Sequence, residues 1–338
     1  MERKQSLLNA DGSPSFGVYT GEIKDLSMSA YPVAFPEFLR KFRMKRWRFV
    51  GLFSPEFVCG AAVVDLGYVG SCFAYVFDLK TKNLYEFRAQ SPLAKSVAMA
   101  DHAQKGRIAF VQGSNRVEML FNEEGRSSLV VQAQTPRGPI HIDARFNESY
   151  EFTTPHQVVS PTPKELFAFT HKSASLPAEG VLSFPGGSYD IHPDQTTAAV
   201  DHTAGIHDYH WVWFWASLGG FTSSGKRIGL NLVEPIHHPT INENALWVDG
   251  KRYPVGRTRF LFDRNRILEP WTIQSDDGQV DLRFKPLGER AETVNAGIIL
   301  SRFHQPIGHY TGHFLLPHGE KIGIDSITGV AEDHEARW

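Results

Sequence analysis

The feature that most constrains the fold is a regular alternation of short β-prone runs with turn residues. Asp-Gly separates strand-like runs in "ALWVDGKRYPV" (245–255) and in "WTIQSDDGQVDLRF" (271–284), and His318-Gly319 separates two more. Asp-Gly between such runs is the strongest short-range signal for a hairpin, because a two-residue turn requires positive φ angles. The second half of the chain is therefore predicted to form antiparallel hairpins.

The first half shows the same punctuation. Residues 57–88 divide into three strand-like runs with turns at 65–70 and 80–83, and residues 106–134 continue the meander. Helix is scarce: the best candidate is 36–47, where Phe38, Leu39, Phe42 and Trp47 follow a helical spacing. The fold class predicted from these patterns is mainly β, with few short helices.

The domain organisation is predicted from a looser segment. Prolines and serines gather between 153 and 187, where periodicity is weak, so we expect one domain over 1–160 and a second, carrying the site, over 161–338. Each half then holds about eight to ten short strands, the number that closes a small barrel with room for one ligand.

Composition narrows the range of partners. The net charge is −2 and charged residues make up 21% of the chain, so there is no electrostatic reason to expect nucleic acid or an anionic membrane as a partner. No run of about 18 apolar residues is present, and the first residues lack the apolar core of a signal peptide. We expect a cytoplasmic protein with no stable membrane insertion; its oligomeric state stays open. Two cysteines, Cys59 and Cys72, do not make a disulfide framework.

Several longer motifs resemble a known family. They are "RWRFVGLFSPEFVCGAAVVDLGYVGSCFAYVFD", the run "AAVDHTAG…WVWFWASLGG…IGLNLVEP…NENALWVDGKRYPV", and the ending "GHYTGHFLLPHGEKIGIDSITGVAEDHEARW". Their residues and order resemble an uncharacterised family catalogued as domain of unknown function 2804. The layout is also similar to that of the carotenoid hydratase and tocopherol cyclase group, whose members pair two lipocalin-like β-barrels. The resemblance thus implies two lipocalin-like antiparallel β-barrel domains.

The most unusual segment is "IHDYHWVWFWA" (206–216). In a strand, successive side chains point to opposite faces, so His207, Tyr209, Trp211, Trp213 and Trp215 share one face. Two interpretations stay open: this face packs against the partner barrel, or it lines a ligand cavity to which the indole rings give rigid area and one donor each. We expect the second.

Polar residues near this strand are candidates for catalysis. Asp201 and His202 precede it, and a carboxylate beside an apolar wall has a raised pKa and can act as a general acid. The alternative for Asp201 is a solvated residue in a turn. The predicted catalytic residues are Asp201, His202, Tyr209, His210 and Glu243, and the predicted ligand-binding residues are Trp211, Trp213, Asn231 and Glu234.

A metal or cofactor is not predicted. Six histidines lie between 192 and 238 together with Asp190, but no His-Glu-x-x-His or Cys-x-x-Cys spacing accompanies them. His309, His313 and the pair Glu332 and His334 are interpreted as hydrogen-bonded strand residues. No phosphate-binding loop, dinucleotide fingerprint or G-x-S-x-G elbow is present.

These patterns favour a protein that binds an apolar or partly apolar small molecule in a β-barrel cavity. We expect cofactor-independent acid/base chemistry of the hydratase, isomerase or cyclase type, with Asp201 as the proton donor. The alternatives are a lipid or pigment carrier without catalysis, and a carbohydrate-active enzyme that uses an Asp/Glu pair.

Overall fold

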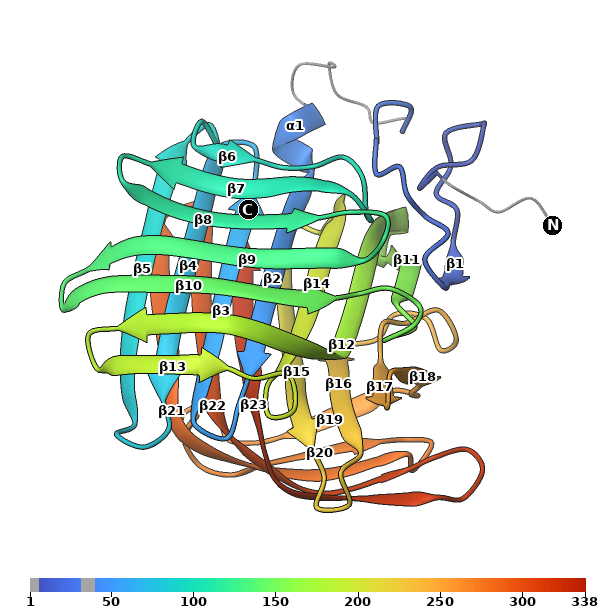
Figure 1. The fold of residues 1–338 in the computed structure, drawn as a ribbon. Helices are drawn as coiled ribbons and strands as arrows, with labels where there is room; N and C mark the ends of the chain where they lie inside the picture. Colours follow the sequence, from blue (N-terminus) through green and yellow to red (C-terminus); the bar gives the residue numbers. More distant parts are fainter. Residues whose placement is uncertain (1–5, 32–39) are drawn as a thin grey trace.

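Antiparallel strands make up almost all of the regular secondary structure. The computed structural model describes residues 6–31 and 40–338, and 66% of the chain is strand against 1% helix. The strands form two sheets (Figure 1). The helical elements in the described ranges are the single turn α1 (Arg40–Arg43) and the 3-10 turn η2 (Pro163–Glu165).

The first sheet is a nearly closed barrel in which β7 to β10 cross in front of β2 to β5 (Figure 1). Its main path, in spatial order, is β5 (Asn83–Pro92), β4 (Val69–Asp78), β3 (Phe57–Asp65), β2 (Lys45–Phe53), β14 (Thr197–Ile206), β12 (Leu166–Phe184), β10 (Gly138–Asn147), β9 (Arg126–Thr135), β8 (Asn115–Phe121), β7 (Gly106–Gln112) and β6 (Val97–Ala98). Off this path, β1 (Gly17–Tyr19) pairs with β11 (His156–Thr162), and both β11 and β13 (Gly187–Ile191) pair with β12.

The second sheet is a half-barrel. Its spatial order is β18 (Lys251–Pro254), β17 (Ala245–Val248), β16 (Arg227–Glu234), β15 (His210–Phe221), β23 (Lys321–Arg337), β22 (Ile299–Leu315), β21 (Val280–Ala296), β20 (Trp271–Ser275) and β19 (Thr258–Leu261). The predicted fold class is confirmed as a mainly β, lipocalin-like pair of antiparallel sheets, of which the second is open rather than closed.

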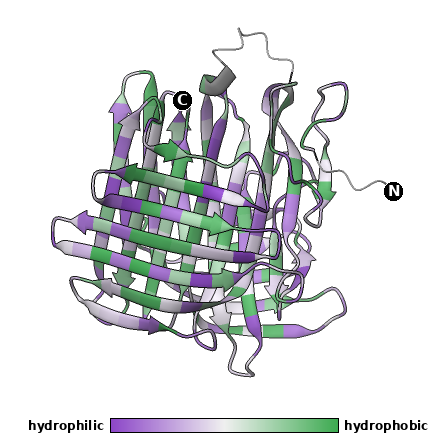
Figure 2. Ribbon diagram, turned by 45° about the horizontal axis from the view of Figure 1, so that its top comes forward, coloured by the Kyte–Doolittle hydropathy of each residue, from purple (hydrophilic) through white to green (hydrophobic). Residues whose placement is uncertain are grey.

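Alternation along the strands divides the apolar side chains into separate cores, and Figure 2 shows the corresponding bands of hydrophobic and hydrophilic residues. On β2, Val50 and Leu52 point into the first barrel, whereas Phe49 and Phe53 point outward. Phe49 packs against Trp215 of the second sheet, and both outward residues belong to a third core between the two sheets. Burying each such large side chain stabilises the fold by roughly 1.5–3 kcal/mol.

The predicted helix at 36–47 is wrong where it can be checked. Residues 32–39 lie outside the described ranges, helix covers only Arg40–Arg43, and β2 begins at Lys45. The apolar residues of β2 fit a period of two as well, and pairing with β3 and β14 on both sides decides between the two periods.

The segment that was expected to be irregular contains the long strand β12. A bulge between Ser173 and Leu176 bends it, so that it pairs with β11, β10 and β13 as well as β14. The predicted domain boundary at 160/161 falls within β11 (His156–Thr162), inside the first sheet. The chain passes to the second sheet between Ile206 and His210.

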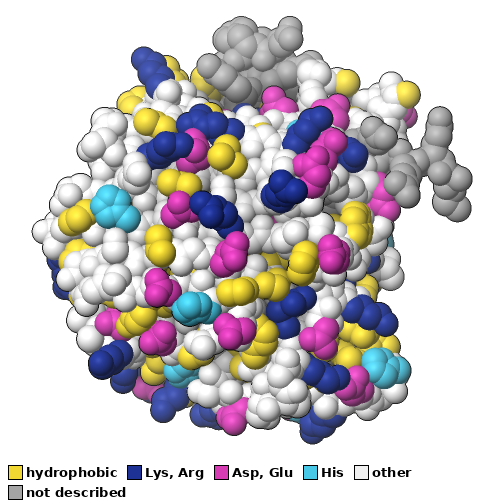
Figure 3. Space-filling model, in the orientation of Figure 1, with side chains coloured by type: hydrophobic (Ala, Val, Ile, Leu, Met, Phe, Trp, Pro, Cys, Tyr) yellow, Lys and Arg dark blue, Asp and Glu magenta, His cyan; other side chains and the backbone are white. Residues whose placement is uncertain are grey.

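The predicted turns are present. Asp249 and Gly250 connect β17 to β18 with φ angles of 50° and 80°, the left-handed pair that a two-residue hairpin requires. Cys59 and Cys72 are both buried and free. On the face in Figure 3, Lys and Arg side chains are interspersed with Asp and Glu. Across 6–31 and 40–338, helices of the length and apolarity needed to span a membrane are absent.

A candidate active-site cavity between the two sheets

A cavity of about 650 Å³ lies where the outer face of the first sheet meets the second sheet. Strands β2, β3, β4, β12 and β14 supply one side, and β15, β21, β22 and β23 supply the other. This volume is within the range of small-molecule sites. The alternation that forms the core between the sheets therefore also lines a space that the core does not fill.

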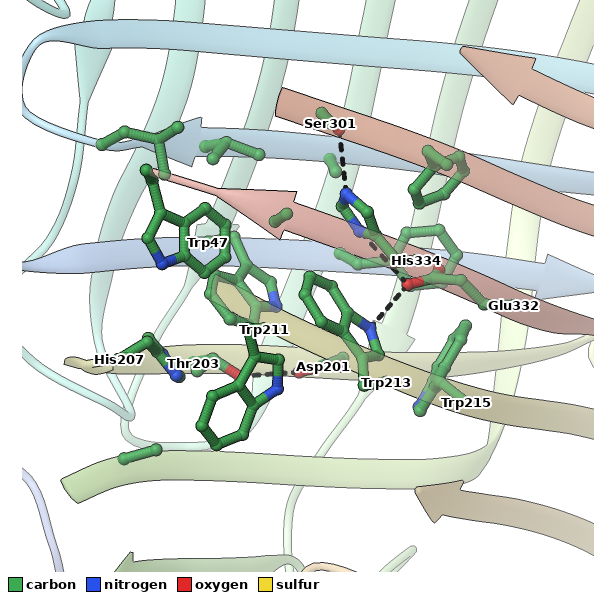
Figure 4. Close-up of a pocket in the computed structure, with 18 of the residues that line it drawn as sticks. Trp47, Asp201, Thr203, His207, Trp211, Trp213, Trp215, Ser301, Glu332 and His334 are labelled. Atoms are coloured by element: carbon green, nitrogen blue, oxygen red, sulfur yellow. Dashed lines mark hydrogen bonds and ion pairs between the residues drawn. The ribbon is translucent and has the colours of Figure 1, made fainter. Parts of the chain in front are cut away.

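Three tryptophans of β15 line this cavity on alternate positions, namely Trp211, Trp213 and Trp215 (Figure 4). Trp47 of β2 stacks on Trp213, with ring centroids 6.5 Å apart and an interplanar angle of 6°. Trp215 also packs edge-on against Phe49 of the first sheet, at 5.5 Å. Each of the two interpretations of this face thus describes part of it, because the same strand face packs at one end and lines the cavity at the other.

A buried lysine joins two carboxylates at the cavity wall. Lys172 is 2% exposed, and its Nζ lies 2.5 Å from Asp201 Oδ1 and 2.8 Å from Glu243 Oε2. Lys172 and Asp201 are directly opposed in the β12–β14 register, so their side chains share a face. Glu243 comes from the segment that connects β16 to β17. Thr203 donates a further hydrogen bond to Asp201 at 3.2 Å.

These charges shift the pKa values of the group in definite directions. Burial raises the pKa of Glu243; Lys172 opposes the rise and the neighbouring Asp201 adds to it, so that the net shift is upward. Burial alone would lower the pKa of Lys172, but the two carboxylates reverse the effect and raise it. The lysine therefore stays charged, and Glu243 is the carboxyl that holds a proton more readily than usual.

His207 faces the cavity without a hydrogen-bond partner. It is buried, and neither ring nitrogen is bonded to any described residue. Its ring lies 5.5 Å from that of Trp47 and 5.7 Å from that of Trp211. Burial, with a smaller effect from Lys45, lowers the pKa of His207 to about 4. A neutral imidazole with both nitrogens unused can hydrogen-bond a polar group of a ligand.

A second polar group comes from β22 and β23. Ser301 Oγ and His334 Nε2 are 2.9 Å apart, and His334 Nδ1 lies 3.8 Å from Glu332 Oε1. Glu332 accepts hydrogen bonds from Trp213 Nε1 at 2.8 Å and from Gln305 Nε2 at 3.1 Å. All five residues line the cavity, and Figure 4 shows Trp213 between Asp201 and the Glu332–His334 pair.

Three predicted catalytic residues lie away from the cavity. His202 follows Asp201 on β14 and so points the other way, into the first barrel, where Arg48 Nη1 approaches its Nδ1 at 3.5 Å. Tyr209 precedes β15, is 44% exposed and donates to the carbonyl of Ile298. His210 is exposed and pairs with Glu335 at 3.0 Å. The prediction of His202, Tyr209 and His210 as catalytic residues at this cavity is therefore wrong, because alternation and the end of the strand direct them elsewhere.

Of the two other predicted ligand-binding residues, Asn231 supports the cavity lining from behind, and Glu234 lies outside it. Asn231 accepts a hydrogen bond from Trp215 Nε1 at 2.8 Å and donates one to the Glu243 carbonyl at 2.9 Å, so it fixes the positions of two lining residues. Glu234 accepts the backbone N–H of Phe260 at 2.7 Å. Neither residue lines the cavity. Of the predicted residues, the cavity thus brings together Asp201, Glu243, Trp211 and Trp213.

Sequence reasoning missed several lining residues. Lys172 lies in a segment that was interpreted as loose, and Trp47 in a segment that was interpreted as a helix. Glu332 and His334 are two residues apart and so share a strand face, which could be predicted from the sequence, but this spacing does not indicate a cavity. Within the described ranges, no group of three His, Cys, Asp or Glu side chains is arranged to hold a metal ion.

Comparisons with known proteins place the fold. The profile of a family described as Domain of unknown function (DUF2804) matches residues 1–338. No curated protein matches the chain. A Nitrosomonas europaea protein with the provisional name AttH has a similar crystal structure, with a TM-score of 0.52 and 10% sequence identity over 87% of this chain and 93% of that chain. Kievitone hydratase from Nectria haematococca aligns with a TM-score of 0.45 and 10% identity over 86% of this chain and 88% of that chain. At this level of identity, the Nitrosomonas structure shows a shared fold.

Proposed function

The chain belongs to the DUF2804 family, as its motifs predicted, and we propose that it binds an apolar, unsaturated small molecule between its two sheets and acts on it by acid/base chemistry. The observation that carries this proposal is the single buried lysine shared by Asp201 and Glu243 at the wall of an aromatic cavity. Perturbed titratable groups in such a cavity are the usual sign of a functional site.

The proposal assigns the proton donor to Glu243. Two carboxylates beside one ammonium carry a net negative charge, and this charge favours the retention of one proton. The direction of the pKa shift supports Glu243 as the carboxyl that keeps it. Asp201, which was expected to be the donor, is instead the 2.5 Å partner of Lys172 and accepts a bond from Thr203. Its proposed role is to hold Lys172 and to maintain the charge that keeps Glu243 protonated.

The proposed reaction begins with proton transfer from the Glu243 carboxyl to one carbon of a carbon–carbon double bond. The other carbon becomes cationic, and the faces of Trp211 and Trp213 stabilise this charge. A water oxygen then bonds to the cationic carbon and releases a proton, which completes a hydration. Loss of a neighbouring C–H proton gives an isomerised alkene instead. Both routes balance without an oxidant or a reductant.

The carbohydrate-active alternative receives less support. A glycosidase requires two carboxyl groups on either side of the scissile bond, whereas Asp201 and Glu243 both bind the same ammonium group. A carrier without catalysis is the stronger rival, because the same aromatic walls would hold an apolar ligand whether or not it reacts.

Farnesol, an acyclic alcohol with several alkenes, is a suitable probe. We expect the wild-type protein to bind it, measured by quenching of tryptophan fluorescence, and to incorporate deuterium into it in deuterium oxide, measured by mass spectrometry. Glu243→Gln should lower the rate of incorporation by roughly 10²–10⁴-fold, the range for loss of a general acid. The exposed Glu124→Gln serves as the matched control. Farnesol binding without incorporation by the wild type would identify a carrier, and an unchanged rate in Glu243→Gln would refute the assignment of the acid.

A further inference from the structure

Glu332 differs from the other carboxylates of the cavity. Four acidic side chains line it within the described ranges, and three of them bind a lysine or an arginine: Asp201 and Glu243 bind Lys172, and Glu292 binds Arg290. Glu332 is 8% exposed, and among the described residues His334 is the one basic side chain that it meets within 4 Å. A buried carboxylate without a permanent cation is costly, so Glu332 depends on its hydrogen-bond donors and on the neighbouring His334 ring.

The neighbours of His334 give its two ring nitrogens different roles. Its Nδ1 faces Glu332 at 3.8 Å and its Nε2 faces Ser301 Oγ at 2.9 Å. With the proton on Nδ1, directed toward the carboxylate, Nε2 accepts the hydroxyl proton of Ser301. The lone pairs of Ser301 Oγ then accept a proton from a molecule in the cavity. This arrangement of a hydroxyl, an imidazole and an orienting carboxylate is the general form of an activated-hydroxyl site.

The rings around this group hold it in one orientation. Trp213 lies 4.1 Å from the His334 ring and Phe303 lies 4.9 Å from it, the latter edge-on. Trp213 also donates to Glu332, and Gln305, which donates to Glu332, accepts the hydroxyl of buried Tyr75 at 2.8 Å. The base is therefore fixed by packing and hydrogen bonds, as a catalytic group requires.

We infer that Ser301 and His334 together form the base that activates the attacking water, and that Glu332 is the positioning residue. The substrate class is an elongated alkene that lies across Trp213. The inference rests on the proposed function, because it supplies the second half of the same reaction. The acid side contributes a proton from Glu243, and the base side removes one from the attacking water.

The steps balance. The Glu243 proton forms a C–H bond at one alkene carbon while the π electrons leave the other carbon cationic. The water oxygen bonds to that carbon as its proton passes to Ser301 Oγ and the Ser301 proton passes to His334 Nε2. The products are an alcohol, a Glu243 carboxylate and a His334 imidazolium, which Glu332 stabilises. Transfer of the imidazolium proton back to Glu243 through water restores the starting state, and the net reaction is addition of one water.

The test separates the two halves with two readouts on farnesol in deuterium oxide. Deuterium incorporation into recovered farnesol and its isomers reports the acid step, and the mass of added water reports the base step. We expect His334→Gln to lower water addition by roughly 10²–10⁴-fold while deuterium incorporation continues. Ser301→Ala should act in the same direction, and Glu332→Gln should shift the pH profile of water addition. His141→Gln, at an exposed position on β10, is the control.

The outcomes distinguish this inference from the function on which it rests. Loss of deuterium incorporation and of water addition in Glu243→Gln, with loss of water addition alone in His334→Gln, supports the proposed function and the base assignment. Water addition within twofold of wild type in both His334→Gln and Ser301→Ala overturns the base assignment and leaves the acid in place. Deuterium incorporation without water addition by the wild type likewise overturns the base alone. An inactive wild type refutes the proposed function and the base together.

Discussion

Replacement of Lys172 by methionine is the perturbation that tests the cavity chemistry most directly. Methionine keeps much of the length and apolar volume of lysine, so the main loss is the ammonium group that lies 2.5 Å from Asp201 and 2.8 Å from Glu243. Removing one partner of a buried ion pair costs about 3–5 kcal/mol, because the other charge is left without compensation. Here two carboxyl groups lose their partner, but the cavity can admit water beside them. We therefore expect the free energy of unfolding at pH 8 to fall by about 3 kcal/mol, the low end of that range.

The loss should depend on pH in a definite direction. The pKa of Glu243 is already raised in the folded wild type, and without Lys172, which opposes that rise, it moves further up. A carboxyl with a higher pKa in the folded state than in the unfolded state stabilises the fold below its unfolded pKa. That contribution disappears as the pH rises through the folded pKa. Lys172→Met should therefore be close to wild type near pH 5 and should lose stability progressively toward pH 8.

Urea titrations of wild type and Lys172→Met at pH 5, 6.5 and 8 give the comparison. Lys321→Met, at an exposed position on β23, controls for loss of a lysine as such. Addition of Glu243→Gln to Lys172→Met removes one of the two stranded carboxylates and should recover more than 1 kcal/mol at pH 8, as expected for coupled neighbours. A stability loss that is equal at pH 5 and pH 8, with no recovery in the double variant, would show that Lys172 contributes by packing and not by charge.

Two further predictions concern the aromatic wall and the interior of the first barrel. Trp213 is half-buried at the cavity, so Trp213→Leu should weaken binding of the neutral dye Nile red about tenfold and lower the free energy of unfolding by about 1–2 kcal/mol in urea titrations. Trp271 lies in the fully buried core of the second sheet, so Trp271→Leu should lower the free energy of unfolding by about 3–5 kcal/mol and leave dye binding intact. Equal losses of stability in the two variants would show that no cavity adjoins Trp213. Burial would raise the pKa of Glu148, but Arg48 at 2.8 Å and the hydrogen bond from His171 lower it to about 2. This ion pair should therefore contribute up to about 3 kcal/mol to the free energy of unfolding. The contribution is present above the ordinary pKa of 4.5 and is lost as the pH falls toward 2. Glu148→Gln should thus make stability depend less on pH in the acid range, and an unchanged pH dependence would contradict this prediction.

Much of the local structure was determined by the sequence itself. The hairpin at Asp249-Gly250 and the alternation in "WVWFW" depend on residues within one turn or one strand, so the printed order of residues is enough to predict them. The helix predicted at 36–47 failed because a short basic, aromatic run fits both periods, and only pairing with β3 and β14 selects the strand. The length of β12 was missed because its prolines and serines are characteristic of loops, whereas a bulge and four partner strands accommodate them.

The composition of the cavity was decided by the tertiary structure. Lys172 meets Asp201 because β12 and β14 pair in one register, and Glu243 reaches Lys172 from the connection between β16 and β17. Their neighbours His171 and His202 form the next pair of the same register and point into the barrel instead. A slip of one residue in either strand would exchange the inward-facing and outward-facing side chains of that strand. Pairing between strands, which no local pattern encodes, therefore determines which charges face the tryptophans.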